Sequence, residues 1–139
     1  MGTDRQPDHR EIISRSDLHY QGPTERRESG LPLGNGRMGS LLWSTGTSIR
    51  FQINRDDVYA NGCATNSFPE IDTDYATGCG FVDIDFADLG DDVFSEADTQ
   101  QHLNIYDGLA SLHGKELDIR AFIHSDSDVL AIEVTDNRK

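Results

Sequence analysis

The chain has 139 residues, and its 12 basic and 25 acidic side chains give a formal net charge of −13. A chain of this length forms at most one domain with a modest core, and only 35% of its residues are hydrophobic. This net negative charge repels nucleic acid and anionic lipid, which are therefore disfavoured as partners. Sugars, cations and basic proteins remain as possible partner classes. The apolar runs are too short for a membrane helix, and residues 1–10 lack the hydrophobic core of a signal peptide.

Residues 1–17 are rich in charge and poor in apolar pattern, which predicts a flexible arm. Residues 18–38 show little periodicity. The first clear strand begins at 41–43, and Thr-Gly-Thr at 45–47 predicts a turn. Apolar and polar residues then alternate over 49–53, so this strand has one buried face and forms a hairpin with the strand before it.

A long connection is predicted over residues 54–78, which are rich in Asn, Asp, Gly and Thr. It is longer than the usual connection in a compact domain, and such loops are either functional or disordered. Tyr59 and Tyr75 lie within it. Their flat apolar faces with polar edges suit sugar rings, whereas Trp43 lies in an apolar run and is expected to pack in the core.

The second half of the chain repeats the alternating pattern. Strands are predicted over 82–86, 117–124 and 129–134, and a bent apolar segment over 101–113 with Gly108 as its bend. No stretch of helical length has a period near 3.6. The sequence therefore predicts an all-β fold, an antiparallel β-sandwich.

The segment Leu31–Gly39 reads LPLGNGRMG and predicts a sharply shaped loop that leads into a strand. It also matches the dinucleotide pattern G-x-G-x-x-G. That pattern needs a strand before it and a helix after it, because the helix N-terminus binds the pyrophosphate. Here Pro32 precedes the glycines and a hairpin is predicted after them, which disfavours nucleotide binding.

Other chemistry-bearing residues give weaker signals. Aspartates cluster over 83–92 and at 126–128, and solvated turns explain them better than calcium, which stays an alternative. The histidines are scattered, and a structural role is favoured for each. Cys63 and Cys79 lack partners at zinc-ligand spacing, and their pairing stays open.

The runs LPLGNGRMGSLLW and IRFQINRDDVYANG resemble the N-terminal β-domain of helical-barrel glycoside hydrolases, such as the alpha-L-fucosidases of glycoside hydrolase family 95. In that family a Pro-Leu-Gly-Asn-Gly-Arg loop precedes two strands, the second ending in an Asn-Glu-Asp-Thr-Leu-Trp-like segment. Here Arg55 replaces the glutamate and Tyr59 the tryptophan, which points to a sister N-terminal domain of unknown function in predicted glycosyl hydrolases. The run HLNIYDGLASLHGKELDIRAFIHSDSDVLAIEVT is similar to the family's later strands, so the resemblance covers residues 18–136.

In such enzymes the catalytic acid and base lie in a later (α/α) barrel, so the resemblance implies no catalytic residue, cofactor or metal in this chain. It implies a β-domain over 18–139, an incomplete part of a larger sandwich, that packs against the barrel of a secreted or periplasmic parent. The residues expected to border the substrate or the barrel are Asn35, Arg37, Asn54, Asp56, Asp57, Tyr59 and Asn61. The alternative is a stand-alone carbohydrate-binding or interaction module, with calcium in its acidic turns.

Overall fold

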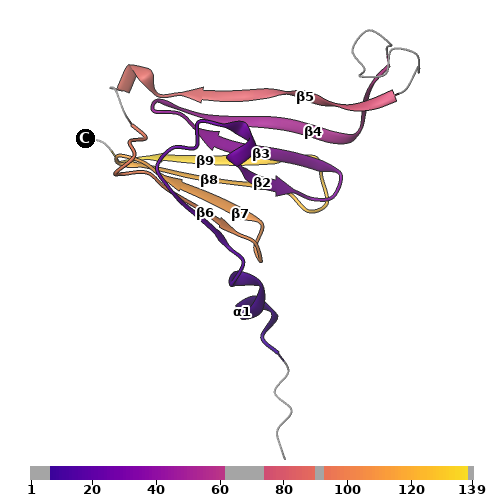
Figure 1. Cartoon of the computed structure of the whole chain (residues 1–139), viewed down its shortest axis with the longest axis horizontal. Coiled ribbons are helices and arrows are strands. Elements are labelled where there is room, and N and C mark those ends of the chain that lie inside the picture. The colour runs from indigo at the N-terminus through magenta and orange to yellow at the C-terminus, as the bar shows by residue number, and fades with distance from the viewer. Residues whose placement is uncertain (1–6, 62–73, 90–92, 138–139) are drawn as a thin grey trace, which may run out of the picture.

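The computed structural model describes residues 7–61, 74–89 and 93–137 and places them in two antiparallel sheets (Figure 1). One sheet has five strands in the order β1-β6-β7-β8-β9, and the other has four in the order β2-β3-β4-β5. The all-β sandwich predicted from the alternating pattern is therefore confirmed.

The five-stranded sheet consists of β1 (Leu18–Gln21), β6 (Gln100–Asn104), β7 (Leu109–His113), β8 (Leu117–Ile123) and β9 (Leu130–Asp136). The four-stranded sheet consists of β2 (Leu31–Gly34), β3 (Met38–Ser44), β4 (Ser48–Asn61) and β5 (Asp74–Asp85). The helical elements are α1 (His9–Ser14) and two 3-10 turns, η1 (Arg27–Ser29) and η2 (Ala87–Leu89).

The core lies between the sheets and takes every second side chain from their strands. In β8 the burial alternates along the whole strand, with Leu117 and Ile119 fully covered and Arg120 exposed. Alternation buries one face of a strand because successive side chains point to opposite sides of the sheet. The largest fully buried apolar side chains in the described residues are Phe51, Phe94, Leu31, Leu42, Ile49, Leu112, Leu117 and Ile119.

Three parts of the chain differ from the sequence-based predictions. β1 and β2 lie within 18–38, where no strand was predicted, because each has only four residues. The long connection predicted over 54–78 is wrong at both ends, because β4 continues to Asn61 and β5 begins at Asp74. The pairing of β4 with β5 is irregular between Ile53 and Tyr59. The alternation of apolar and polar residues that identifies a strand is therefore interrupted there.

The predicted flexible arm contains the short helix α1, which the sequence analysis did not predict. The Asp8 side chain caps it by accepting hydrogen bonds from the backbone N–H groups of Arg10 and Glu11 at 3.0 and 3.3 Å. The Arg10 guanidinium donates to Asp107 at 2.7 Å and lies 4.6 Å from the centre of the Tyr106 ring. No side chain of α1 is buried, so it has no apolar stripe to recognise.

Two of the four edge strands, β5 and β9, leave part of each inner face uncovered. Val82 of β5 lies opposite the buried Phe51, and Val134 of β9 lies opposite the buried Ile119, so the register turns both valines inward. Both are nevertheless 40% exposed. The sandwich is thus closed at its centre and open along β5 and β9. In the described ranges, no helix is long and apolar enough to cross a membrane.

Replacing Phe51 with alanine is expected to lower the free energy of unfolding by about 3–5 kcal/mol, because it leaves a cavity between the sheets. Phe122→Ala is the matched control. Phe122 lies on the outer face of β8 and is 41% exposed, so its loss is expected to cost less than about 1 kcal/mol. Urea unfolding of the two variants measures the difference, and equal losses would contradict the assignment of faces.

Candidate functional site

The turn between β2 and β3 is shaped by the side chain of Asn35. Its Oδ1 accepts hydrogen bonds from the backbone N–H groups of Arg37 at 3.0 Å and Met38 at 2.7 Å. Gly36 has φ +89, and a Cβ there would meet nothing within 4 Å, so the backbone angle itself favours glycine. The sharp loop predicted for Leu31–Gly39 is confined to residues 35–37, because Leu31–Gly34 forms β2 and Gly39 already belongs to β3. A strand follows the turn where a dinucleotide site needs a helix.

The other side of the Asn35 amide reaches across to the second sheet. Its Nδ2 donates to the backbone carbonyl oxygens of His124 at 2.9 Å and Ser127 at 3.2 Å, in the turn between β8 and β9. One side chain thereby joins the ends of the two sheets. Both polar atoms of this amide are engaged within the chain, so Asn35 acts as a brace for this end of the sandwich.

Two arginines and two aspartates form a charge network beside this turn. Arg55 makes a two-pronged contact with Asp57 at 2.9 and 2.8 Å and reaches Asp128 at 3.3 Å. Arg37 lies 3.6 Å from Asp57 and 3.5 Å from Asp128. Hydrogen bonding from Arg55, followed by its charge, holds the pKa of the Asp57 carboxyl below its ordinary value. Asp128, one of the residues that suggested calcium, thus faces two guanidinium groups.

A shallow hollow opens beside this network and gathers three of the predicted residues, Arg37, Asn54 and Asp56. The hollow is also lined by Gly34, Gly36, Met38, Gly39 and Arg55. The backbone N–H of Asp56 donates to the Arg37 carbonyl at 3.0 Å, which holds β4 against the turn. With Asn35 and Asp57 at its side, five of the seven predicted residues come together at one end of the sandwich.

The two remaining predicted residues lie farther along the β4–β5 arm. Tyr59 lies beyond the residues that line the hollow, and its side chain is 59% exposed. Asn61 ends β4, and its side chain lies outside the described residues, as does that of Tyr75 on β5. Cys79 is exposed on β5, and Cys63 lies outside the described residues.

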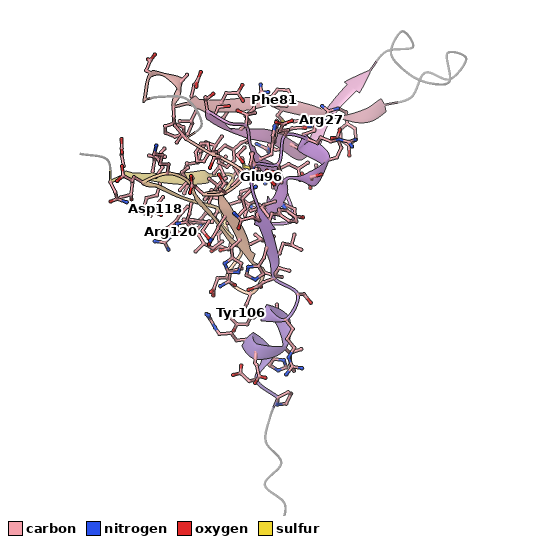
Figure 2. All side chains as sticks on the ribbon, turned by 60° about the vertical axis from the view of Figure 1, so that its left-hand side comes forward. Arg27, Phe81, Glu96, Tyr106, Asp118 and Arg120 are labelled. Atoms are coloured by element: carbon pink, nitrogen blue, oxygen red, sulfur yellow. The ribbon has the colours of Figure 1, made fainter. Side chains whose placement is uncertain are left out.

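Trp43 is buried, although not between the sheets. The register places it on the outer face of the four-stranded sheet, opposite Arg50, and it is only 4% exposed. Phe81, which is labelled in Figure 2, meets its ring edge-on at 6.4 Å, and the Arg50 guanidinium lies 5.7 Å from the ring centre. Arg50 also pairs with Asp83 at 2.7 Å. The aromatic group therefore stabilises the outer surface of this sheet.

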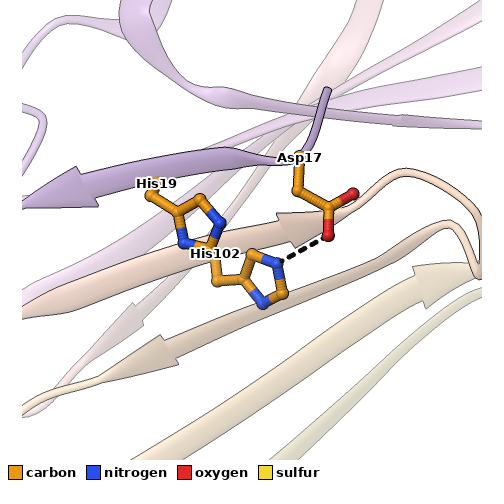
Figure 3. Close-up of side chains that lie close together, drawn as sticks. All are labelled: Asp17, His19 and His102. Carbon is orange, nitrogen blue, oxygen red and sulfur yellow. Dashed lines mark hydrogen bonds and ion pairs between the residues drawn. The ribbon is translucent and has the colours of Figure 1, made fainter. Parts of the chain in front are cut away.

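Sequence reasoning missed a second site, on the outer face of the five-stranded sheet. Asp17, His19 and His102 lie close together there (Figure 3), although the sequence analysis treated the histidines as scattered. The signal was the antiparallel pairing of β1 with β6, which places His19 opposite His102. That pairing was not visible, because β1 itself was not recognised as a strand.

The fold and both sites define an antiparallel β-sandwich protein with a braced end and a histidine-lined outer face. A scan against protein-family models finds no match, and a search of curated proteins finds no significant one.

Replacing Asn35 with aspartate is expected to lower the free energy of unfolding by about 1–3 kcal/mol. The carboxylate still accepts from Arg37 and Met38, but it cannot donate to the β8–β9 turn and sets a charge against two carbonyl oxygens. Ser127→Ala is the control, because it keeps the backbone carbonyl that Asn35 contacts, and it is expected to change stability by less than about 0.5 kcal/mol. Urea unfolding that finds Asn35→Asp as stable as the control would contradict the brace.

The pKa of Asp57 is expected below the ordinary value of 3.8, and Arg55→Gln is expected to raise it toward that value. Because the pKa is lower in the folded than in the unfolded chain, the stabilisation is complete above the unfolded pKa. It is lost as the pH falls through the folded pKa, which confines the loss to acidic solution. Carboxyl NMR titration measures the shift. Arg120→Gln, which removes an unrelated pair with Glu133, should leave it unchanged, and equal pKa values in all three proteins would disprove the coupling.

Proposed function

We propose that this chain is a non-catalytic β-sandwich domain of a carbohydrate-active glycoside hydrolase, and that its braced end packs beside a helical-barrel catalytic domain of the same protein. The observation that carries the proposal is the gathering of Asn35, Arg37, Asn54, Asp56 and Asp57 around one hollow. They are five of the seven residues that the sequence resemblance singled out, and they come from the strand β4 and from the turn between β2 and β3.

The braced end of the sandwich is rigid enough to serve as a docking surface. The turn is fixed by hydrogen bonds of Asn35, and the neighbouring charges are paired with one another, so little conformational freedom is lost when a partner binds. The β4–β5 arm continues beyond the paired part of β3 and carries the exposed Tyr59, a side chain that supplies a large contact area with a polar end.

The same residues are poorly suited to hydrolysis. Glycoside hydrolysis needs a carboxylic acid whose pKa is raised so that it can protonate the leaving group, with a second carboxylate at a defined separation. At the braced end, Asp57 has a lowered pKa, and both Asp57 and Asp128 are bound to guanidinium groups. These two carboxylates therefore act as partners of arginines, which favours a non-catalytic role for the chain.

A second candidate function is glycan binding by the arm, because Tyr59 is the most exposed of the large apolar side chains in the described residues. An exposed aromatic face stacks on a sugar ring without the remainder of an active site. Glycan binding needs no second domain, so it can be measured on the purified chain alone and tested separately from the first proposal.

The proposal is tested with the purified chain and with its complete coding region. We expect no turnover of a panel of aryl α- and β-glycosides, and we expect the reading frame to continue into paired helices of a barrel. Turnover that stays with the chain through purification would overturn the non-catalytic role. A coding region without a barrel would overturn the assignment to a hydrolase.

Calorimetric titration with oligosaccharides tests the glycan alternative. If Tyr59 binds sugar, Tyr59→Ala loses the heat signal. Tyr106→Ala, which removes a similarly exposed aromatic from the β6–β7 turn, keeps it. No signal with any of the three proteins would remove this alternative and leave the docking role.

A further inference from the structure

Two histidines face each other across neighbouring strands on the outer face of the five-stranded sheet. His19 of β1 lies directly opposite His102 of β6, and their rings stack with centroids 4.3 Å apart and planes 8° apart (Figure 3). The flanking pair Leu18 and Leu103 packs on the core, so alternation turns the histidines outward. The backbone register thus fixes two imidazoles side by side.

A carboxylate completes the cluster from the residue before β1. Asp17 Oδ2 lies 3.1 Å from Nε2 of His102, and its Oδ1 accepts the backbone N–H of Ile105 at 2.9 Å. The hydrogen bond from the backbone of Ile105 is the largest cause that lowers the pKa of Asp17, and the two histidines lower it further. The carboxyl is therefore ionised at neutral pH. Its side chain is only 11% exposed, which fixes its orientation.

An ion pair between Asp17 and His102 does not account for His19. Within the described residues the His19 ring forms no hydrogen bond, and its neighbour is a second imidazole. Two imidazoles beside one oriented carboxylate bring together nitrogen and oxygen donor atoms from three residues.

We propose that Asp17, His19 and His102 bind a divalent first-row transition-metal ion, of which Zn²⁺ is the probe. Each residue offers one ligand atom, and these atoms lie within 4.8 Å of one another. Zinc bound at its usual distance of about 2.0–2.1 Å needs ligand atoms about 3.4 Å apart, so the atoms must move closer by about 1 Å. The exposed ring of His19 can make that movement by rotation about its side-chain bonds.

The surroundings suit a hydrated cation. The two histidines line an open hollow beside Asp17, and this hollow is also lined by Gln21, Gln100, Ser111 and His113. Among the described residues lining it, none is lysine or arginine, and the net charge of −13 attracts cations to the chain. Two nitrogen donors and one oxygen donor favour zinc, copper or nickel over calcium and magnesium, which prefer oxygen alone. Three protein ligands leave a further position for water or a donor from a partner.

A bound ion would fasten the edge of the sheet. β1 is an edge strand of four residues, and His102 is separated by 85 residues from Asp17 in the sequence. An ion that binds the folded chain but not the unfolded one raises its stability by mass action. The site therefore predicts a chain whose melting temperature depends on transition metal, independently of the function proposed above.

Chelator-treated protein titrated with Zn²⁺ by calorimetry tests the site, with Cys63 and Cys79 replaced by serine in every sample to remove thiol ligands. At about 100-fold excess over the dissociation constant, we expect the melting temperature to rise by roughly 9 °C, and no rise with Ca²⁺ or Mg²⁺. His19→Ala and His102→Ala are each expected to weaken binding by roughly 100-fold. With Cu²⁺, electron paramagnetic resonance is expected to show two coordinated nitrogens, reduced to one in either variant.

Two controls separate the cluster from the rest of the surface. His9→Ala removes an exposed histidine from α1, and His113→Ala removes the third histidine of the hollow, so both should bind Zn²⁺ like the parent. Asp17→Asn keeps the acceptor for Ile105 but loses the charge, and it should bind more weakly. No binding by the parent at millimolar Zn²⁺, or binding unchanged in His19→Ala and His102→Ala, would overturn the proposal. An equal loss in His113→Ala would overturn the three-residue assignment.

Discussion

The alternation of side chains along paired strands is the constraint on which the remaining features depend. When Leu18 and Leu103 pack between the sheets, the next position on each strand must point to the other face, and there it places His19 opposite His102. A slip of one residue in β1 would turn His19 toward the core and Leu18 toward solvent, and it would separate His19 from His102. The surface chemistry of the protein is thus fixed by the way its core is filled.

Register in such a sandwich needs support where the strands turn. The Asn35 amide gives that support at one end, because its oxygen shapes the turn of one sheet while its nitrogen contacts the turn of the other. The Arg55 and Asp57 pair then holds β4 where it leaves the sandwich. Hydrogen bonds and ion pairs contribute little individually at exposed positions, so their effect here lies in choosing one geometry over others.

Much of the fold could be predicted from local pattern alone. β8 was recognisable because seven residues alternate without interruption, and β4 because Ile49, Phe51 and Ile53 share a face. β1 has too few residues to show a period, and α1 has no buried face. The arm formed by β4 and β5 has the composition of a loop, and only its pairing across the sheet identifies it as strand.

The candidate sites, too, could be predicted only in part from local sequence. The glycine-rich turn was recognisable because the backbone angle of Gly36 requires a particular residue type. Its contact with Ser127 was not, since the two lie 92 residues apart along the chain. The histidine cluster had the same difficulty, because His102 lies 85 residues from Asp17 along the chain. Contacts of this kind are set by topology, which a single sequence does not display.

The open edges of the sandwich have a consequence for how the protein behaves at high concentration. β5 and β9 are edge strands, and each carries one inward-facing valine, which is the arrangement that favours strand addition by other molecules. The net charge of −13 keeps copies of the chain apart by mutual repulsion. This protection weakens where salt screens the carboxylates or acid neutralises them. The surplus of carboxylates thus protects the exposed edge strands against aggregation.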